Sequence, residues 1–423
     1  MTVIRTLSGA PTPALGPDPD RAENLDAYRA RRGHRAEVDP DTLLARVEAA
    51  DLRGHGGAGF PFAVKLRAVR ERGSSAGTDP VVVANGEEGE PGSVKDRWLV
   101  RARPHLVLDG LVQAARITGA ERGYVYLSDS QAEGSVRKAL AAARPALPIE
   151  VVRTEPAYVA GEESAVVRRI DGGPALPTAK PPRPFEHGVG GAPTLVANVE
   201  TLARLALLTH RDDAAGTVLL TLSGGSGEAL LTEARYRTTL RELARLQGTP
   251  VPRAVLMGGL FGGLLVSDAL ELPLDRARLA LAGTGLGCGA IRFLAPDECP
   301  VSVAADAVDH LAAESSRQCG VCVSGTRSLR DTLVALTRAQ CPDAGVDQLA
   351  RWSQGLPGRG ACGLLDAAAK LAATLLAGFP ELVGAHLRHP CPVCAATPPA
   401  AGARLRVPVP EPAGTPHALA AVD

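Results

Sequence analysis

The cysteines of this chain are confined to its last third, and this limits what that part can fold into. The chain has 423 residues and 8 cysteines, and the first of them is Cys288. A long chain with few, late cysteines is not a disulfide scaffold, and such crowding in a reducing compartment favours metal or cluster ligation. The sequence therefore predicts a C-terminal region organised by bound metal. The alternative is eight unligated thiols.

Upstream of the cysteines, apolar periodicity predicts an α/β domain with a partly parallel sheet over residues 23–212. Short β-branched runs bounded by turn residues indicate buried strands at 80–85, 124–127 and 149–152. Helical patterns cover 41–52, 105–118 and 130–143. Helices that alternate with strands in this way are typical of parallel sheets.

The pattern changes twice more along the chain. Short strands at 217–224, 229–233 and 254–259, with one helix at 239–246, predict a β-grasp-like domain over 213–300. A nearly all-helical pattern then predicts a helical domain over 301–390. Residues 1–22, rich in Pro, Gly and Asp, are expected to be a disordered lead, and residues 391–423 a C-x-x-C motif with a loose tail.

The overall charge excludes one class of partner. Acidic and basic residues number 46 each, which argues against a nucleic-acid partner because that function leaves a basic imbalance. The most apolar stretch, 361–380, contains Asp366 and Lys370, so no membrane-spanning segment is expected. The N-terminus lacks a signal-peptide pattern, and we expect a cytoplasmic protein that can attach to a membrane partner.

A glycine-rich loop, RGHGGAGFPFAVKL, spans residues 53–66. Gly54, Gly56 and Gly59 have the G-x-G-x-x-G spacing, but the motif follows a helix and not the strand that a dinucleotide fingerprint needs. Glycines allow the backbone to approach a ligand closely, and the amides that start the next helix favour a phosphate. Lys65 would add a positive charge. The alternative is a flexible turn between two helices.

Two acidic turns form the next candidate sites. NGEEGEPGSVKD, residues 85–96, follows a buried strand directly, at the place where ligand sites of α/β sheets gather. YVAGEESAVVRR, residues 158–169, puts Glu162 and Glu163 at the start of a helix, where the dipole favours carboxylates. Asparagine and carboxylate side chains suit the hydroxyls of a ribityl or ribose group. The alternatives are a solvated loop for the first turn and helix capping for the second.

Lysine is rare in the chain, with 5 Lys against 41 Arg. Lys65, Lys95 and Lys180 nevertheless fall inside the motifs, which indicates positions that need a compact, rotatable ammonium. Chance retention is the alternative.

These segments, in order and followed by KPPRPF…G-x-P-T-L-V-A-N-V-E-T-L (residues 180–202), resemble the flavin site of the NADH-binding subunit of respiratory complex I. The resemblance covers roughly residues 25–390. It implies an FMN-binding α/β domain, then a ubiquitin-like β-grasp (SLBB) domain, then a helical four-iron cluster domain.

The resemblance also implies which residues bind. Those expected on the phosphate side of FMN are Gly54, His55, Gly56, Gly57, Ala58, Gly59 and Lys65. Those expected around the ribityl chain and ring are Asn85, Glu87, Glu88, Tyr158, Gly161, Glu162, Glu163, Asn198 and Thr201. Those expected to contact NADH are Phe60, Lys65, Glu90 and Glu163, with Glu90 and Glu163 at its nicotinamide end.

The chain departs from the family at several of these positions. His55 replaces an arginine, which weakens a positive contact or makes it pH-dependent, and Ala197 replaces the first of two asparagines. Ala68 and Arg183 replace the aromatic residues that stack on the adenine of NADH. Phe60 is retained, and Phe185 or a stacked Arg183 are the candidate substitutes. FMN binding is therefore better supported than NADH binding.

The cluster motif of the family, E-S-C-x-x-C-x-x-C with a fourth cysteine about 40 residues later, is incomplete here. ESSRQCGVC, residues 314–322, keeps Cys319 and Cys322 but has Ser316 at the first ligand position, and Cys362 is the later cysteine. A four-iron cluster takes four thiolates. Three possibilities stay open: an oxygen ligand from Ser316, a three-iron or labile cluster, or another nearby cysteine.

The remaining cysteines have no place in the family motif. The pair Cys391 and Cys394 is a candidate to supply the missing ligand, or to bind separately with Cys341. Cys288 and Cys299 are expected to pack as small hydrophobic side chains.

The predicted function is that of an NADH dehydrogenase-like oxidoreductase. NADH would reduce FMN, and FMN would pass electrons to the iron–sulfur cluster and on to a redox partner, either a ferredoxin-like protein or another redox subunit, including one held in a membrane. Two alternatives remain: an FMN module fed by a ferredoxin or another donor that is not NADH, and a degenerate, non-enzymatic scaffold.

Overall fold

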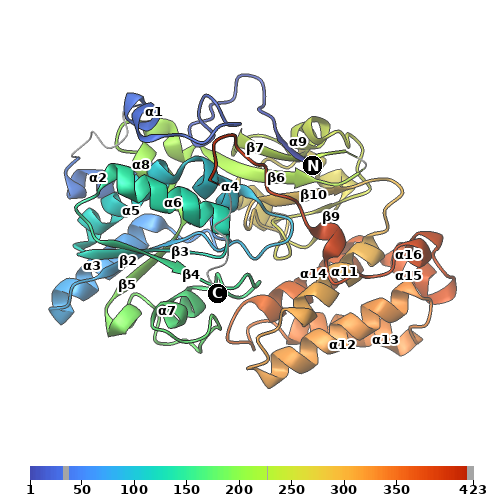
Figure 1. The fold of residues 1–423 in the computed structure, drawn as a ribbon. Coiled ribbons are helices and arrows are strands. Elements are labelled where there is room, and N and C mark those ends of the chain that lie inside the picture. The colour runs from blue at the N-terminus through green and yellow to red at the C-terminus, as the bar shows by residue number, and fades with distance from the viewer. Residues whose placement is uncertain (32–37, 226, 417–423) are drawn as a thin grey trace.

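Two β-sheets and a helical bundle follow one another along the chain (Figure 1). The computed structural model describes residues 1–31, 38–225 and 227–416. In Figure 1 the parallel sheet with its helices and the second sheet lie side by side, and the helical bundle extends from them as a separate layer.

The first sheet has four parallel strands in the order β4-β3-β2-β5. These strands are β2 (Val81–Asn85), β3 (Arg122–Leu127), β4 (Ile149–Arg153) and β5 (Thr194–Asn198). Successive residues of β2 point to opposite faces, so Val82 and Ala84 join the large core while Val81 and Val83 pack into a smaller one. The predicted strands and their parallel pairing are confirmed, and β5 is an additional strand.

Helices cover both faces of this sheet, which explains why its strands are continuously apolar. Those of the α/β region are α1 (Leu25–Ala30), α2 (Pro40–Ala49), α3 (Phe62–Ala76), α4 (Lys95–Ala102), α5 (Pro104–Thr118), α6 (Ser130–Ala143), α7 (Glu163–Ile170) and α8 (Val199–Leu207). The large core lies between the sheet and the helices around α5, while α7 covers the other face. Asp39 caps α2 and Asp129 caps α6, each through its side chain.

The second sheet has the order β1-β7-β6-β10-β8-β9. Its elements are β1 (Thr2–Ile4), β6 (Thr217–Ser223), β7 (Ala229–Arg235), α9 (Leu240–Gln247), β8 (Ala254–Leu256), β9 (Leu264–Val266), α10 (Arg276–Leu281) and β10 (Ala290–Leu294). The β6–β7 hairpin is antiparallel, and β10 returns beside β6 in parallel. This arrangement, with α9 packed on β6, is the predicted β-grasp unit.

The expectation of a disordered lead over residues 1–22 is wrong. Residues 2–4 pair with β7, and Ala14 and Leu15 are fully buried. Both of their amides donate to Glu233 at 3.0 Å, and the Arg103 guanidinium donates to the Leu15 carbonyl. Buried polar side chains thus satisfy backbone groups of a segment that lacks regular structure.

The tail beyond residue 391 is also ordered as far as residue 416, contrary to the expectation of a loose tail. The amide of Val407 donates to the Pro91 carbonyl at 2.9 Å, and that of Ala413 donates to the Asp20 carbonyl at 2.7 Å. The tail therefore runs back from the bundle across the acidic loop to the N-terminal segment. Residues 417–423 lie outside the described part.

The C-terminal region is helical, as predicted. Its helices are α11 (Pro300–Ala313), α12 (Gly320–Thr337), α13 (Asp343–Gly355), α14 (Leu364–Gly378), α15 (Pro380–Arg388) and α16 (Pro392–Ala396), and short 3₁₀ turns occur elsewhere at 189–191, 212–215, 267–271 and 403–405. Among the described residues, no single helix has the length and apolar character of a membrane span. The α14–α15 pair passes that test when taken together, with a bend of 92° between its helices.

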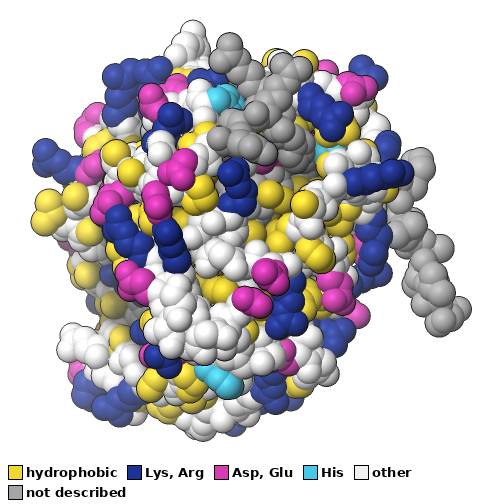
Figure 2. Space-filling model, turned by 90° about the vertical axis from the view of Figure 1, so that its left-hand side faces the viewer, with side chains coloured by type: hydrophobic (Ala, Val, Ile, Leu, Met, Phe, Trp, Pro, Cys, Tyr) yellow, Lys and Arg dark blue, Asp and Glu magenta, His cyan; other side chains and the backbone are white. Residues whose placement is uncertain are grey.

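Charged side chains of both signs are interspersed on the face shown in Figure 2. A different set of charges is buried between the two sheets. Arg204 of α8 contacts Glu200 at 3.0 Å and Glu233 of β7 at 2.7 Å, and Lys95 contacts Glu200 at 3.0 Å. The four side chains are fully buried. This group is called the buried ion network below.

Replacing Arg204 with leucine should destabilise the fold strongly, because Glu233 would then be a buried carboxylate without its cation. Breaking a buried pair in this way costs about 3–5 kcal/mol. Arg211→Leu is the matched control, since its pair with Asp213 at 3.0 Å is exposed and should contribute at most about 1 kcal/mol. Urea unfolding followed by circular dichroism measures both. Equal losses would contradict the importance of the network.

Candidate functional site

The glycine-rich loop connects α2 to α3 and is closed by a hydrogen bond from the Gly54 amide to the Phe60 carbonyl at 2.9 Å. Gly57 and Gly59 have φ angles of 120° and 62°, which side-chain-bearing residues rarely adopt. A Cβ placed on Gly57 would have no neighbour within 4 Å. The backbone of this loop is therefore open on that side and accessible to a ligand.

His55 does not supply the positive contact considered for this loop. Its side chain is 2 % exposed, and its Nε2 lies 3.2 Å from the Tyr236 hydroxyl and 3.8 Å from Glu200. Burial lowers the pKa of His55 to about 3, so the ring is neutral near pH 7. The expectation of a pH-dependent cation here is wrong. The backbone amide of His55 donates to the hydroxyl of Thr201 at 2.9 Å and so ties the loop to α8.

Arg276 of α10 brings a permanent cation to the loop, and sequence reasoning missed it. A Cβ on Gly59 would lie 2.7 Å from the Arg276 Nη1 atom. The guanidinium also stacks over the ring of Tyr236, 5.5 Å from its centroid. More than 200 residues separate the two segments, and arginine is the common basic residue of this chain, so the sequence carried no signal.

Three predicted segments meet at the carboxyl end of the parallel sheet. Asn85 and Asn198 are register partners at the ends of β2 and β5. The Asn85 amide donates to the Gly161 carbonyl at 2.8 Å, and the Asn198 amide donates to Asp96 at 2.7 Å. The first acidic turn, the second acidic turn and the 180–202 segment are thereby joined at the edge where ligands of α/β sheets bind.

Glu87 has the properties of a ligand-binding carboxyl. It is 7 % exposed, and within the described part of the chain neither of its oxygens has a hydrogen-bond partner. Burial raises its pKa to about 7. A buried polar group without a partner is costly, and hydroxyl groups of a bound ribityl chain would satisfy it. The site therefore fits FMN at this position.

Glu88, in contrast, shapes its own loop. Its oxygens accept hydrogen bonds from the Ser93 hydroxyl at 2.6 Å and from the amides of Asp96 and Arg97, both at 3.1 Å. The side chain predicted to touch the cofactor is thus engaged in holding the start of α4.

Glu162 and Glu163 share two lysines. Lys65 and Lys180 each contact Glu163 at 3.1 Å, and Lys180 also contacts Glu162. Burial alone would raise the pKa of Glu163, but the two ammonium groups lower it below its ordinary value. Glu162 also caps α7, since the Ser164 amide donates to it at 2.9 Å, so helix capping and membership of the site coexist.

Glu90 faces the second sheet. It accepts a hydrogen bond from the Leu260 amide at 3.1 Å and lies 3.5 Å from the Tyr158 hydroxyl. Burial raises its pKa to about 7. Glu90 thus links the first acidic loop, the second acidic turn and the β-grasp unit.

The residues considered for adenine stacking are dispersed. Phe60 is 52 % exposed, and Val64, one helical turn later, is 48 % exposed. Arg183 is exposed, and its amide donates to Glu186 at 2.8 Å. Phe185 packs against the large core, so it is not free to replace a stacking ring. Phe60 and Val64 are the exposed apolar side chains beside the loop.

Cys319 precedes α12, Cys322 lies in its first turn, and Cys362 precedes α14. All three pack on one core, and Cys319 and Cys322 add to the rise that burial causes in the pKa of Cys362. The hydroxyl of Ser315 lies 3.7 Å from the Cys322 sulfur, while Ser316 is half-buried in the same loop. The structure thus brings the three expected thiols into one neighbourhood.

The flavin-site segments are connected to this thiol neighbourhood. The Tyr158 amide donates to Glu314 at 2.9 Å, and Glu314 begins the ESSRQCGVC motif. The Tyr158 ring stacks on Phe261 with centroids 6.2 Å apart, and Phe261 lies against Gly363, the residue after Cys362. A continuous packed path therefore runs from the second acidic turn to the cysteines.

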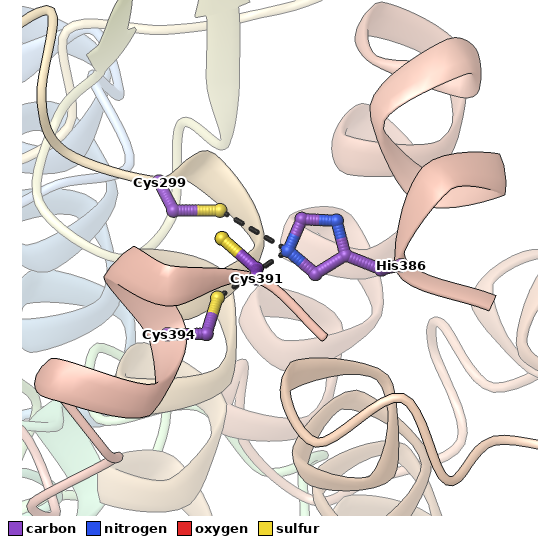
Figure 3. Close-up of side chains that lie close together, drawn as sticks. All are labelled: Cys299, His386, Cys391 and Cys394. Atoms are coloured by element: carbon purple, nitrogen blue, oxygen red, sulfur yellow. Dashed lines mark hydrogen bonds between the residues drawn. The ribbon is translucent and has the colours of Figure 1, made fainter. Parts of the chain in front are cut away.

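Two expectations about the other cysteines are wrong. Cys299 does not pack as an isolated hydrophobic side chain, and the Cys391–Cys394 pair joins neither Cys341 nor the three thiols above. Instead, Cys299, Cys391 and Cys394 form one group with His386 (Figure 3).

Comparison with known proteins identifies the family. Residues 47–207 match the Nuo51 FMN-binding domain, and residues 302–386 match the NADH-ubiquinone oxidoreductase-F iron-sulfur binding region. The second F subunit of the NADH-quinone oxidoreductase of Rhizobium meliloti is 30% identical over 396 residues, which are 86% of this chain and 93% of that protein. The chain belongs to the family of NADH-quinone oxidoreductase F subunits. The predicted fold class, oxidoreductase class and cofactors, FMN and an iron–sulfur cluster, are thereby confirmed.

Two further relatives are parts of hydrogenases. The HndC subunit of the NADP-reducing hydrogenase of Solidesulfovibrio fructosivorans is 29% identical, and the match covers 81% of this chain and 76% of that one. The structure of an NAD⁺-reducing [NiFe]-hydrogenase in the H₂-reduced state superposes with a TM-score of 0.76 at 28% identity, covering 87% of this chain and 67% of that one. The relatives are subunits of redox complexes, which supports the expectation of a redox partner.

Replacing Glu87 with glutamine should remove a pH dependence of stability. The folded-state pKa of about 7 exceeds the ordinary 4.5, so the unfolded chain loses this proton first and stability falls as pH rises from about 4.5 to 7. The neutral Glu87→Gln variant avoids this loss and should be more stable by up to about 3 kcal/mol at pH 8, but not near pH 4.5. Unfolding of the flavin-free chain across this range measures it. Glu150→Gln, at an exposed position, should show no such trend.

Proposed function

We propose that this chain takes electrons from NADH onto FMN and passes them to an iron–sulfur cluster near Cys319, Cys322 and Cys362. One observation carries the proposal. The segments at the carboxyl end of the parallel sheet are joined to the cysteine motif through Tyr158 and Glu314, 2.9 Å apart. A flavin at that edge and a cluster at those thiols would therefore be neighbours.

The residues divide the work of holding FMN. The open glycine backbone, with Lys65 and Arg276 beside it, suits the phosphate. Asn85, Asn198 and the protonated Glu87 suit the ribityl hydroxyls. Bound FMN accepts two electrons from a nicotinamide and releases them one at a time. The protein supplies position and electrostatics, and no side chain acts as a nucleophile.

NADH is the proposed donor because the chain keeps an apolar surface beside the loop. Phe60 and Val64 are exposed there. The loss of rings at Ala68 and Arg183 weakens stacking by about 1 kcal/mol per ring. A second candidate, a ferredoxin or another donor, is favoured by the burial of Phe185, which leaves no ring in the 180–185 segment to stack on adenine.

Anaerobic titration of the purified chain distinguishes these donors. We expect a flavin absorption band that NADH bleaches, with a requirement for NADH that falls about tenfold in Ala68→Phe, because one stacking ring is restored. Ala120→Phe, at a half-buried alanine of the same domain away from the loop, is the control. A band that resists NADH but bleaches with dithionite would assign another donor. Absence of both flavin and iron would contradict the proposed function.

The cluster is proposed to be held by three thiolates, with a serine oxygen at the fourth position. An oxygen ligand binds iron less strongly than the thiolates that such clusters normally use. The Ser316→Cys variant should therefore raise the iron content after purification and slow the loss of cluster absorption in air. Ser315→Cys is the control that separates position from composition. A higher gain at 315 than at 316 would move the ligand to Ser315, whose hydroxyl lies 3.7 Å from Cys322.

We further propose a cytoplasmic redox complex as the setting. The acceptor would be a ferredoxin-like or other redox subunit, or a membrane-held redox partner. The predicted domain limits, 23–212, 213–300 and 301–390, remain part of this proposal, extended by the ordered segments at both ends.

A further inference from the structure

Four metal-binding side chains converge at the end of the helical bundle, outside both sites already described. They are Cys299, His386, Cys391 and Cys394, and their ligand atoms all lie within 4.8 Å of one another. Figure 3 shows the three sulfurs and the imidazole nitrogen pointing toward one another. Three segments contribute: the residue before α11, α15, and the start of α16.

The spacing fits a single tetrahedral ion. Zinc binds sulfur at about 2.3 Å and imidazole nitrogen at about 2.0–2.1 Å, so a tetrahedral site has nitrogen–sulfur separations of about 3.6 Å. The His386 Nε2 atom lies 3.4 Å from the Cys299 sulfur and 3.3 Å from the Cys394 sulfur. A cluster of several irons would hold its ligands farther apart, because each ligand would bind a different iron.

The surroundings of His386 prepare it as a ligand. Its Nδ1 lies 2.8 Å from the Leu382 carbonyl, which places the proton on Nδ1 and leaves the Nε2 lone pair facing the sulfurs. Metal-bound histidines usually have such an outer hydrogen bond. His386 is 2 % exposed, so the imidazole is inside the protein and directed at thiols.

The cysteines are equally fixed in position. Cys299 and Cys391 each stand directly before a helix that begins with a proline, and Cys394 follows one turn after Cys391. Cys299 and Cys394 are 2 % and 3 % exposed. Three thiols and one imidazole in a dry site match the Cys₃His ligand sets of structural zinc.

We propose that this group is a structural zinc site. Binding of Zn²⁺ displaces the protons of the three thiols, and the neutral imidazole completes a site with a net charge of −1. Four protein ligands leave no position open for substrate, and zinc has no redox role. The ion would fasten α15 and α16 to the start of α11, and so anchor the tail that runs back to the acidic loop.

Metal analysis of the full chain tests this, with flavin, iron and zinc measured on the same sample. We expect about one zinc per chain. The zinc should be lost in Cys394→Ser and His386→Ala and retained in Cys341→Ser, whose buried cysteine lies outside the group. Cys319→Ser should lose iron but keep zinc, which separates this site from the proposed cluster. Zinc lost together with iron in Cys319→Ser would overturn the assignment.

A second measurement on the unmodified chain avoids variants that fail to fold. Alkylation mapped by mass spectrometry should find Cys391 and Cys394 protected until a zinc chelator is added, with protection restored by Zn²⁺ alone. Cys341 should be unaffected by the chelator. A disulfide between Cys391 and Cys394 in freshly purified protein, or alkylation indifferent to the chelator, would overturn the zinc site.

Discussion

The buried ion network between the two sheets is the constraint on which the rest of the structure depends. Burial alone would raise the pKa of Glu200, but Lys95 and Arg204 lower it, so this carboxylate stays charged in the interior. Glu200 also accepts from the Leu219 amide of β6 at 2.9 Å, while Glu233 accepts from the two amides of the N-terminal segment. One set of charges thus joins α8, both sheets and the chain's beginning.

The same network sets the shape of the candidate flavin site. Lys95 contacts Asp96 at 2.7 Å, and Asp96 accepts from the Asn198 amide, so the acidic loop and the end of β5 are held together. All three lysines singled out in the sequence make ion pairs at this edge of the sheet. Lys95 is fully buried, where a compact ammonium can meet two carboxylates on different elements.

Local pattern predicted much of the fold because the physical causes are local. Apolar β-branched runs such as residues 80–85 can only be buried strands, and the acidic turn after them had to reach the carboxyl edge of a parallel sheet. The order of residues 1–22 could not be predicted, because it depends on Glu233 and Arg103, which lie far away in sequence. Arg276 and the Cys299–His386 contact escaped for the same reason: single residues carry no periodic signal.

The departures from the family pattern follow a common physical logic. His55 is neutral where the family has a cation, yet Arg276 places a guanidinium against Gly59 of the same loop. A fixed charge is set by position in space and not by position in sequence, so a distant residue can supply it. The cluster loop is different, because a ligand must form a bond at a fixed distance. Ser316 therefore has no remote substitute: the spare thiols of Cys391 and Cys394 are held by His386 and Cys299 at the other end of the bundle.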